Sequence, residues 1–261
     1  MNVDTVLKNI ITLKNVSQSY DDGKTFILKD VSLNIEDKPN IGQFVILMGK
    51  SGCGKSTILR YIAGLQKPTS GEVLVHEKPL TEDRRVSMVF QQYSSMPWYT
   101  VYENIELPLK FKNIAEKERK EKVNEMIKFV GLQGQENKYA VYPTLSGGQL
   151  QRVAIARSLI ASPEILLMDE PFGALDVNTR MQMQDLLLNI WRTYETTIFF
   201  ITHDIAEAVY LGDDILIMSS NPGTIKYHFQ PNLPHAKTKD IKHDAEYINM
   251  VQKIEAVMMT L

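Results

Sequence analysis

The chain contains almost no cysteine: Cys53 is the one thiol among 261 residues. An internal disulfide is therefore excluded, and such usage fits a protein that works in a reducing cytoplasm. Neither sign of charge dominates, since 29 Lys and Arg stand against 31 Asp and Glu, and no basic surplus predicts binding to nucleic acid. The longest apolar runs, such as 165–168 and 198–201, are far too short to cross a bilayer. These absences leave an ordinary globular chain of one domain, or of one domain with an inserted subdomain.

A glycine-rich stretch organises the rest of the chain: Gly49-Lys50-Ser51-Gly52-Cys53-Gly54-Lys55-Ser56-Thr57. It follows an apolar run, 44–48, that predicts a buried strand, and it precedes a run, 57–65, that predicts a helix. Glycines let the backbone turn several N–H groups inward, and the helix start adds its positive end, so phosphate oxygens can bind there. Lys55 would bridge the β- and γ-phosphates, and the Ser56 hydroxyl would complete the shell of a Mg²⁺ ion. A chance glycine turn does not explain the Gly-Lys-Ser-Thr ending, so the pattern predicts a P-loop that binds a nucleoside triphosphate.

The segment before the P-loop alternates apolar and polar residues at 10–16 and, more loosely, at 26–35, which predicts two antiparallel strands. Tyr20 lies in the polar turn between them. Its flat ring can stack on an adenine base, a contact that tolerates loose geometry. The alternative for Tyr20 is a strand-end aromatic that packs on the core.

Two carboxylates, Asp169 and Glu170, end the apolar run 165–168, which predicts a buried parallel strand. Asp169 at the strand's edge can hold the hydration shell of Mg²⁺. Glu170 projects differently and can reach a water in line with the γ-phosphorus, so we predict that it is the general base or water-orienting residue. The alternative is a pair of exposed acids that cap the next segment. A P-loop kinase would need an acceptor pocket and does not call for this glutamate.

A second phosphate-binding pattern is Leu145-Ser146-Gly147-Gly148-Gln149, followed by helical spacing over 150–161. A serine and two glycines before a helix predict another anion-binding helix N-terminus. The chain thus has two such helix starts but one P-loop lysine. With the tyrosine turn, the P-loop and Phe90-Gln91-Gln92 after a strand, this pattern resembles the ATP-binding subunit of an ABC transporter, from Leu13 to about Gly223.

The resemblance implies an α/β fold: a P-loop NTPase (RecA-like) core with an antiparallel β subdomain and an inserted α-helical subdomain. It implies a discontinuous nucleotide-binding core at 1–91 and 152–223, and a helical subdomain carrying the second pattern at 92–151. A C-terminal tail at 224–261 would end in an amphipathic helix. In that tail, the predicted apolar face consists of Ile248, Val251, Ile254, Val257, Met258 and Leu261. The run 215–218 predicts the last core strand.

The resemblance also implies roles for single residues, with ATP and Mg²⁺ as cofactors. Gln91 would contact Mg²⁺ and the attacking water, and His203 would hydrogen-bond the γ-phosphate. Ser146, Gly147 and Gly148 of one copy would cap the γ-phosphate held by the other, which gives two equivalent sites in a two-fold pair. Asp176 would cross the dimer interface, or act as the N-cap of a helix at 177–191, and both roles are compatible.

The full predicted site follows from these roles. The catalytic residues are Glu170, His203 and Gln91, and the metal-binding residues are Ser56, Gln91 and Asp169. The nucleotide-binding residues are Tyr20, Gly49, Ser51, Gly52, Cys53, Gly54, Lys55, Ser56, Thr57, Ser146, Gly147, Gly148, Gln149 and Asp176.

The partners implied are a second copy or a related ATPase subunit, integral membrane permease subunits and a separate substrate-binding protein, with no nucleic acid. The chain would lie peripherally on the cytoplasmic face of the inner (plasma) membrane. Met96, Pro97 and Trp98 are candidates for contact with the membrane subunits, or they close the subdomain's own core. Together with 171–176 and the Pro222-Gly223 turn, they look like the nitrate, sulfonate and taurine importer group, which implies import of a small anion.

Other classes stay open at this point. They are the ATPase of an exporter or lipid-type system, a soluble ABC ATPase acting on DNA or ribosomes, and a non-catalytic nucleotide-binding module. The chain lacks the sustained heptads of DNA-repair members and the paired ATPase units of translation members. The sequence departs from the family pattern at Lys50, at Glu77, where a turn glycine is usual, and in a longer segment at 37–40.

Overall fold

The computed structural model describes residues 8–38, 42–81, 86–92, 94–234 and 237–261, which form two compact units. Unit 1 comprises Met1–Val86 and Thr197–Leu261, and unit 2 comprises Ser87–Thr196. Pro39 and Asn40 of the longer segment lie outside the described residues. The predicted subdomain boundaries stay a prediction.

Unit 1 contains an antiparallel sheet in the order β2-β1-β4-β5. Its strands are β1 (Asn9–Gln18), β2 (Leu28–Glu36), β4 (Ser70–Val75) and β5 (Lys78–Pro79). Leu13 of β1 pairs with Leu33 on one side and with Val73 on the other. The two predicted strands upstream of the P-loop are therefore confirmed as an antiparallel pair.

The hairpin between β4 and β5 turns through only two residues, His76 and Glu77, because Val75 pairs with Lys78. Both turn residues have positive φ, 50° and 58°. Two successive positive φ angles match the right-handed twist of the flanking strands, which is why such turns usually contain glycine. Glu77 thus adopts the conformation that a glycine would adopt more easily.

A second sheet in unit 1 is built around β3 (Phe44–Gly49), which runs parallel to β8 (Thr197–Ile201) and to β9 (Asp214–Ser219). Every residue of β3 and of β8 is buried, as expected for parallel strands with continuous apolar runs. The run 215–218 is confirmed as a buried strand, β9, and an edge strand that was not predicted, β10 (Thr224–Phe229), pairs antiparallel with it. Lys226 and His228 are exposed, as charged and polar residues of an edge strand often are, and they alternate with Ile225, Tyr227 and Phe229.

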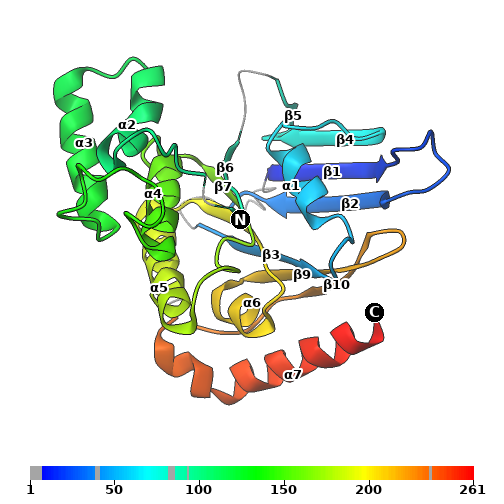
Figure 1. Cartoon of the computed structure of the whole chain (residues 1–261). Coiled ribbons are helices and arrows are strands. Elements are labelled where there is room, and N and C mark those ends of the chain that lie inside the picture. Colours follow the sequence, from blue (N-terminus) through cyan, green and yellow to red (C-terminus); the bar gives the residue numbers. More distant parts are fainter. Residues whose placement is uncertain (1–7, 39–41, 82–85, 93, 235–236) are drawn as a thin grey trace, which may run out of the picture. The chain divides into compact units, whose positions relative to one another are not determined.

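The helices of unit 1 are α1 (Lys55–Ile62), α6 (Ile205–Leu211) and α7 (Ala245–Thr260), with a short 3₁₀ helix, η1 (Lys239–His243), before α7. Figure 1 shows α7 in red beside α6, and the two helices are in contact. The amphipathic tail helix is confirmed, but its buried face consists of Tyr247, Met250 and Ile254. The predicted face is wrong at Ile248, whose side chain is 44% exposed.

Unit 2 contains the parallel strands β6 (Ser87–Val89) and β7 (Ile165–Asp169). Its helices are α2 (Val101–Phe111), α3 (Glu116–Phe129), α4 (Gly147–Leu159) and α5 (Val177–Tyr194). In Figure 1 α2 and α3 lie side by side, and α2 contacts both α3 and α4. The helical spacing at Val123, Met126 and Ile127 is confirmed, because α3 buries these three residues.

Candidate functional site

The P-loop joins the end of β3 to the start of α1, as the sequence predicts. Gly54 is the N-cap of α1 and has a φ of 98°, a conformation that side chains rarely adopt. A Cβ at this position would lie 2.4 Å from Leu28 Cδ2, so bulk is excluded as well. Ser51 and Gly52 are exposed, and Ser56 and Thr57 are half-buried in the first turn of the helix. The loop therefore offers free backbone surface in front of a helix N-terminus, the geometry that suits a phosphate.

Lys55 is buried, with only 6% of its surface exposed. Its Nζ donates to the carbonyl oxygens of Gly49, at 2.9 Å, and of Lys50, at 3.2 Å. Among the described residues, no carboxylate is in ion-pair contact with this ammonium. A buried charge without a counter-charge is costly, so Lys55 fits a site that an anionic ligand completes. The departure at Lys50 leaves this arrangement intact, because Lys50 takes part through its backbone and its side chain is exposed.

Cys53 is buried in the P-loop, with 1% of its surface exposed. A Cβ on Gly49 would lie 2.7 Å from its Sγ, so the thiol is close to the end of β3. Burial raises the pKa of the Cys53 thiol, which disfavours the thiolate needed for redox or nucleophilic chemistry. Its backbone lies against the β9–β10 turn, since a Cβ on Gly223 would lie 2.0 Å from the Cys53 carbonyl oxygen. The contact of Cys53 with nucleotide stays a prediction.

Tyr20 stands out from the surface, with 64% of its side chain exposed. The alternative that this ring packs on the core is therefore wrong. Its hydroxyl oxygen accepts a hydrogen bond from Gln66 Nε2 at 2.9 Å. The adjoining turn is fixed by Asp21, whose carboxylate accepts hydrogen bonds from the Thr25 hydroxyl and backbone N–H, and these bonds lower the pKa of Asp21 to about 2. The ring is thus presented to solvent on a well-anchored turn.

His203 is exposed in the short loop between β8 and α6. The two residues beside it are held tightly: the Thr202 hydroxyl donates to Glu207 Oε2 at 2.6 Å and accepts from the Asp204 N–H at 3.0 Å. Asp204 in turn caps α6 by accepting from the Glu207 N–H at 3.0 Å. Thr202 and Glu207 are buried, 3% and 5% exposed. The sequence gives no signal for this support, because it depends on which side chains face inward.

The carboxylate pair of unit 2 lies at the end of β7, and its two members differ in environment. Asp169 is the last residue of the strand and is 8% exposed, whereas Glu170 is half-buried just beyond it. Glu170 has a φ of 43°, which is uncommon for a residue with a side chain and costs roughly 1–3 kcal/mol. Gln91 Nε2 donates to Glu170 Oε2 at 3.4 Å, so two predicted catalytic residues lie together.

The Ser146 motif forms the N-terminus of α4, as predicted. The Ser146 hydroxyl accepts from the Gln149 N–H at 3.3 Å, and Gln149 Oε1 accepts from the Ser146 N–H at 2.9 Å. These two bonds are a capping box, which stabilises the helix start. A Cβ on Gly148 would lie 2.5 Å from Thr179 Cγ2 of α5, so this glycine is required for packing. Phosphate binding by Ser146, Gly147, Gly148 and Gln149 stays a prediction.

Asp176 caps α5, because its Oδ1 accepts from the Thr179 N–H at 3.0 Å. Hydrogen bonds from the Thr179 hydroxyl and from its backbone N–H lower the pKa of the Asp176 carboxyl. The predicted N-cap role is therefore confirmed. Its role at a dimer interface stays a prediction.

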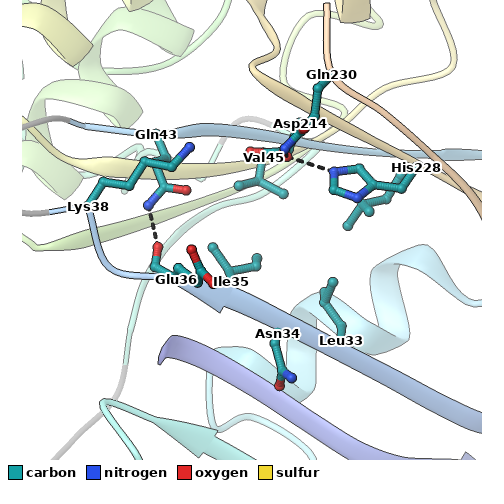
Figure 2. Close-up of a pocket in the computed structure, with 11 residues that line it drawn as sticks. Leu33, Asn34, Ile35, Glu36, Lys38, Gln43, Val45, Asp214, His228 and Gln230 are labelled. Atoms are coloured by element: carbon teal, nitrogen blue, oxygen red, sulfur yellow. Dashed lines mark hydrogen bonds and ion pairs between the residues drawn. The ribbon is translucent and has the colours of Figure 1, made fainter. Parts of the chain in front are cut away.

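A pocket of about 250 Å³ in unit 1 lies between the end of β2 and the strands β3, β9 and β10 (Figure 2). Asp214 is its main polar centre, since its Oδ1 is 2.6 Å from His228 Nε2 and accepts from Gln230 Nε2 at 2.8 Å. No predicted nucleotide-binding residue lines this pocket. It is therefore separate from the P-loop.

The described residues contain no cluster of three or more His, Cys, Asp or Glu side chains arranged to hold a metal ion. None of their helices is both long and apolar enough to traverse a bilayer.

Comparison with known proteins gives matches over most of the chain. A family model described as ABC transporter matches residues 28–173. The nitrate import ATP-binding protein NrtD from Synechocystis is 43% identical over 246 residues, covering 90% of this chain and 89% of the relative. The aliphatic sulfonates import ATP-binding protein SsuB from Bacillus cereus is 42% identical, covering 88% of this chain and 89% of the relative. A dimeric ATP-binding cassette in a post-hydrolysis state bound to ADP and Pi is 36% identical with a TM-score of 0.71, covering 84% of this chain and 98% of that one.

Proposed function

Because this chain belongs to the family of ABC transporter ATP-binding proteins, which bind and hydrolyse ATP, we propose that it powers import of a small anion such as nitrate or a sulfonate. The energy would come from ATP hydrolysis by two copies of the chain, or by this chain paired with a related subunit. Separate integral membrane subunits would form the path for the anion, and a binding protein would deliver it. The chain would lie peripherally on the cytoplasmic face of the membrane.

The structural observation that carries the ATP-binding part of this proposal is the buried Lys55 ammonium at the start of α1, whose partners among the described residues are carbonyl oxygens alone. The β- and γ-phosphates of ATP supply the missing negative charge. The exposed ring of Tyr20 would stack on the adenine. The remaining P-loop residues would donate backbone N–H groups to the phosphates.

Mg²⁺ would be held by Ser56, Gln91 and Asp169 together with phosphate oxygens and water. This donor set suits the ion, which prefers oxygen ligands and usually takes only one or two carboxylates from a protein. When bound, Mg²⁺ would neutralise the charge that develops on the phosphate oxygens during hydrolysis.

Glu170 would accept the proton of the attacking water, and Gln91 would help to orient that water. Their 3.4 Å contact supports a shared task. His203 would donate a hydrogen bond to the γ-phosphate from the loop between β8 and α6, which the hydrogen bonds of Thr202 and Asp204 hold in place. Ser146, Gly147 and Gly148 of the second copy would cap that phosphate, so the pair closes with ATP and opens after hydrolysis. Work on the membrane then comes from the difference in affinity of the pair for ATP and for ADP.

The hydrolytic role of Glu170 is tested by Glu170→Gln. Loss of a general base lowers the rate by roughly 10²- to 10⁴-fold, while ATP binding should persist and an ATP-dependent dimer should accumulate. Steady-state ATPase assays and light scattering measure the two effects. Glu164→Gln, immediately before β7, is the matched control and should behave like the wild type. Normal turnover by Glu170→Gln would remove this residue from the mechanism.

The cargo and the partners need a separate experiment. A pull-down from detergent-solubilised membranes should recover integral membrane subunits. Cells lacking this gene should lose uptake of labelled nitrate, of taurine or of an alkanesulfonate, and the wild-type gene should restore it. Recovery of ribosomes or DNA in place of membrane subunits would refute the transport role while leaving the ATPase assignment in place.

A further inference from the structure

The segment 94–100 follows Gln91 and has neither helical nor strand structure, yet it is fixed by one buried amide. Asn104 in α2 is fully buried. Its Nδ2 donates to the carbonyl oxygens of Met96, Tyr99 and Thr100 at 3.0, 3.2 and 3.0 Å, and its Oδ1 accepts from the Met96 N–H at 2.8 Å. The carbonyl oxygens of Met96, Tyr99 and Thr100 each also accept a backbone N–H hydrogen bond, so the Asn104 amide adds a second bond to each of them. Asn104 therefore ties the loop to α2 through three carbonyl groups and one N–H group.

Arg157 joins this loop to α4. Its Nη2 donates to the Ser94 carbonyl oxygen at 2.7 Å and to the Ser94 hydroxyl at 3.0 Å, and its Nη1 donates to Asn104 Oδ1 at 3.4 Å. A further hydrogen bond runs from the Ser95 hydroxyl to the Leu150 carbonyl oxygen at 3.5 Å. Residues from three segments, 94–100, α2 and α4, thus form one network within unit 2.

Burial of the Arg157 guanidinium costs free energy that a purely structural role would not require. Burial lowers the pKa of its guanidinium, and all its hydrogen-bond acceptors in the described part of the chain are neutral. A buried cation without a carboxylate gives less stability than an apolar side chain of the same size. What the guanidinium does supply is a rigid fork of donors, which fixes direction as well as distance.

The helix that carries Arg157 also carries the Ser146 motif. α4 begins directly after Ser146, and Arg157 lies about 15 Å further along the same helix, at 1.5 Å per residue. We propose that Arg157 and Asn104 are positioning residues, which lock 94–100 to α4 so that Gln91 and the Ser146 motif move as one body. This inference rests on the proposed function, because it assumes that Gln91 orients the attacking water.

The test is a double-mutant cycle between Arg157 and Gln91 in the full-length chain. Arg157→Lys keeps the charge but loses the fork. It should lower kcat for ATP by roughly tenfold to a hundredfold, because small displacements of a positioning group cost that much, with KM changed less than about twofold. In a Gln91→Ala background the same substitution should cost less than about twofold, since the group that it positions is gone.

Arg152→Lys is the matched control. Arg152 lies on the same helix, burial lowers the pKa of its guanidinium too, and its Nη1 donates to the Val130 carbonyl oxygen at 2.6 Å. Its hydrogen bond runs to Val130 and not to 94–100, so kcat should stay near the wild-type value. Ser94→Ala is a milder second variant that removes one hydrogen bond. This variant should lower kcat by roughly twofold to fivefold. In the Gln91→Ala background it should leave kcat unchanged.

Hydrogen exchange adds a readout that does not depend on activity. The Met96 amide should exchange faster in Arg157→Lys, while the amides of α4 stay protected. An equal loss of kcat with and without Gln91 would mark a general structural role and overturn the inference, as would an unchanged kcat in Arg157→Lys. If Gln91→Ala alone has no effect, the assumed role of Gln91 fails and this inference with it, while the Glu170→Gln result still decides on hydrolysis.

Discussion

Lys237 connects the C-terminal segment to α6, and its replacement by methionine is the sharpest test of how unit 1 is held together. The side chain is 2% exposed. Its Nζ donates to the carbonyl oxygens of Leu211 and Gly212, both at 2.8 Å, and to Asp213 Oδ1 at 3.3 Å. Those two carbonyls end α6, so the ammonium also faces the negative end of a helix.

The size of the expected loss of stability depends on which hydrogen-bond acceptors lose their donor when Lys237 is replaced. Asp213 is 26% exposed, so water can replace its lost partner. The carbonyls of Leu211 and Gly212 belong to buried residues, and each unsatisfied buried acceptor costs about 1–3 kcal/mol. Methionine keeps the apolar stem in place. We therefore expect Lys237→Met to lower the free energy of unfolding by about 2–4 kcal/mol.

Urea unfolding followed by far-UV circular dichroism measures this loss. Tryptophan fluorescence is unsuitable because Trp98 and Trp191 both belong to unit 2. Hydrogen exchange should show the loss in α6 and α7 first. The matched control is Lys253→Met on α7, where Nζ lies 5.3 Å from the Phe229 ring, a contact that contributes only about 0.5–1 kcal/mol. If the two variants are equally stable, the reasoning about Lys237 is refuted.

Three further predictions concern the nucleotide site and the β4–β5 turn. Ser146→Arg should leave nucleotide binding by the monomer intact but prevent ATP-driven pairing, and unchanged pairing in light scattering would contradict the capping role. Gly54→Ala should weaken ATP binding more than tenfold in a fluorescent-nucleotide titration, since it adds a clash to backbone strain, whereas Gly52→Ala, with φ of 80° and open space around it, should cost less. Glu77→Gly should raise Tm by about 1–2 °C because it relieves a left-handed residue, and Glu77→Ala, which keeps the Cβ, should leave Tm unchanged.

The parts of the fold that the sequence predicts are those set by local chemistry. The P-loop is encoded within nine residues, because glycines at strained positions and a lysine at a helix start have few other uses. The caps at Ser146 and Asp176 are local as well, since a side chain reaches only the next turn of its own helix. Buried parallel strands such as β3 and β8 are recognised by continuous apolar runs.

The features that escape prediction depend on contacts between distant segments. The edge strand β10 is not predicted although Ile225, Tyr227 and Phe229 alternate with Lys226 and His228, because this short run lies in a polar stretch flanked by prolines. The network of Asn104 and Arg157 involves residues 94 to 157, and helical spacing does not reveal that a charged side chain points inward. The positive φ of Glu170 is likewise invisible, because glutamate is not a residue that predicts a left-handed turn.

The close approach of Gly223 to Cys53 has a practical consequence for anyone who modifies this protein. The tip of the β9–β10 hairpin carries an exposed Asn221 and would ordinarily be chosen for an epitope tag or a fluorescent label. Here Gly223, beside that tip, lies against the predicted phosphate-binding loop, since a Cβ on Gly223 would lie 2.0 Å from the Cys53 carbonyl oxygen. An insertion at this turn would displace the P-loop backbone beside Cys53. Weak ATP binding by a protein tagged there would therefore reflect the tag and not the native protein.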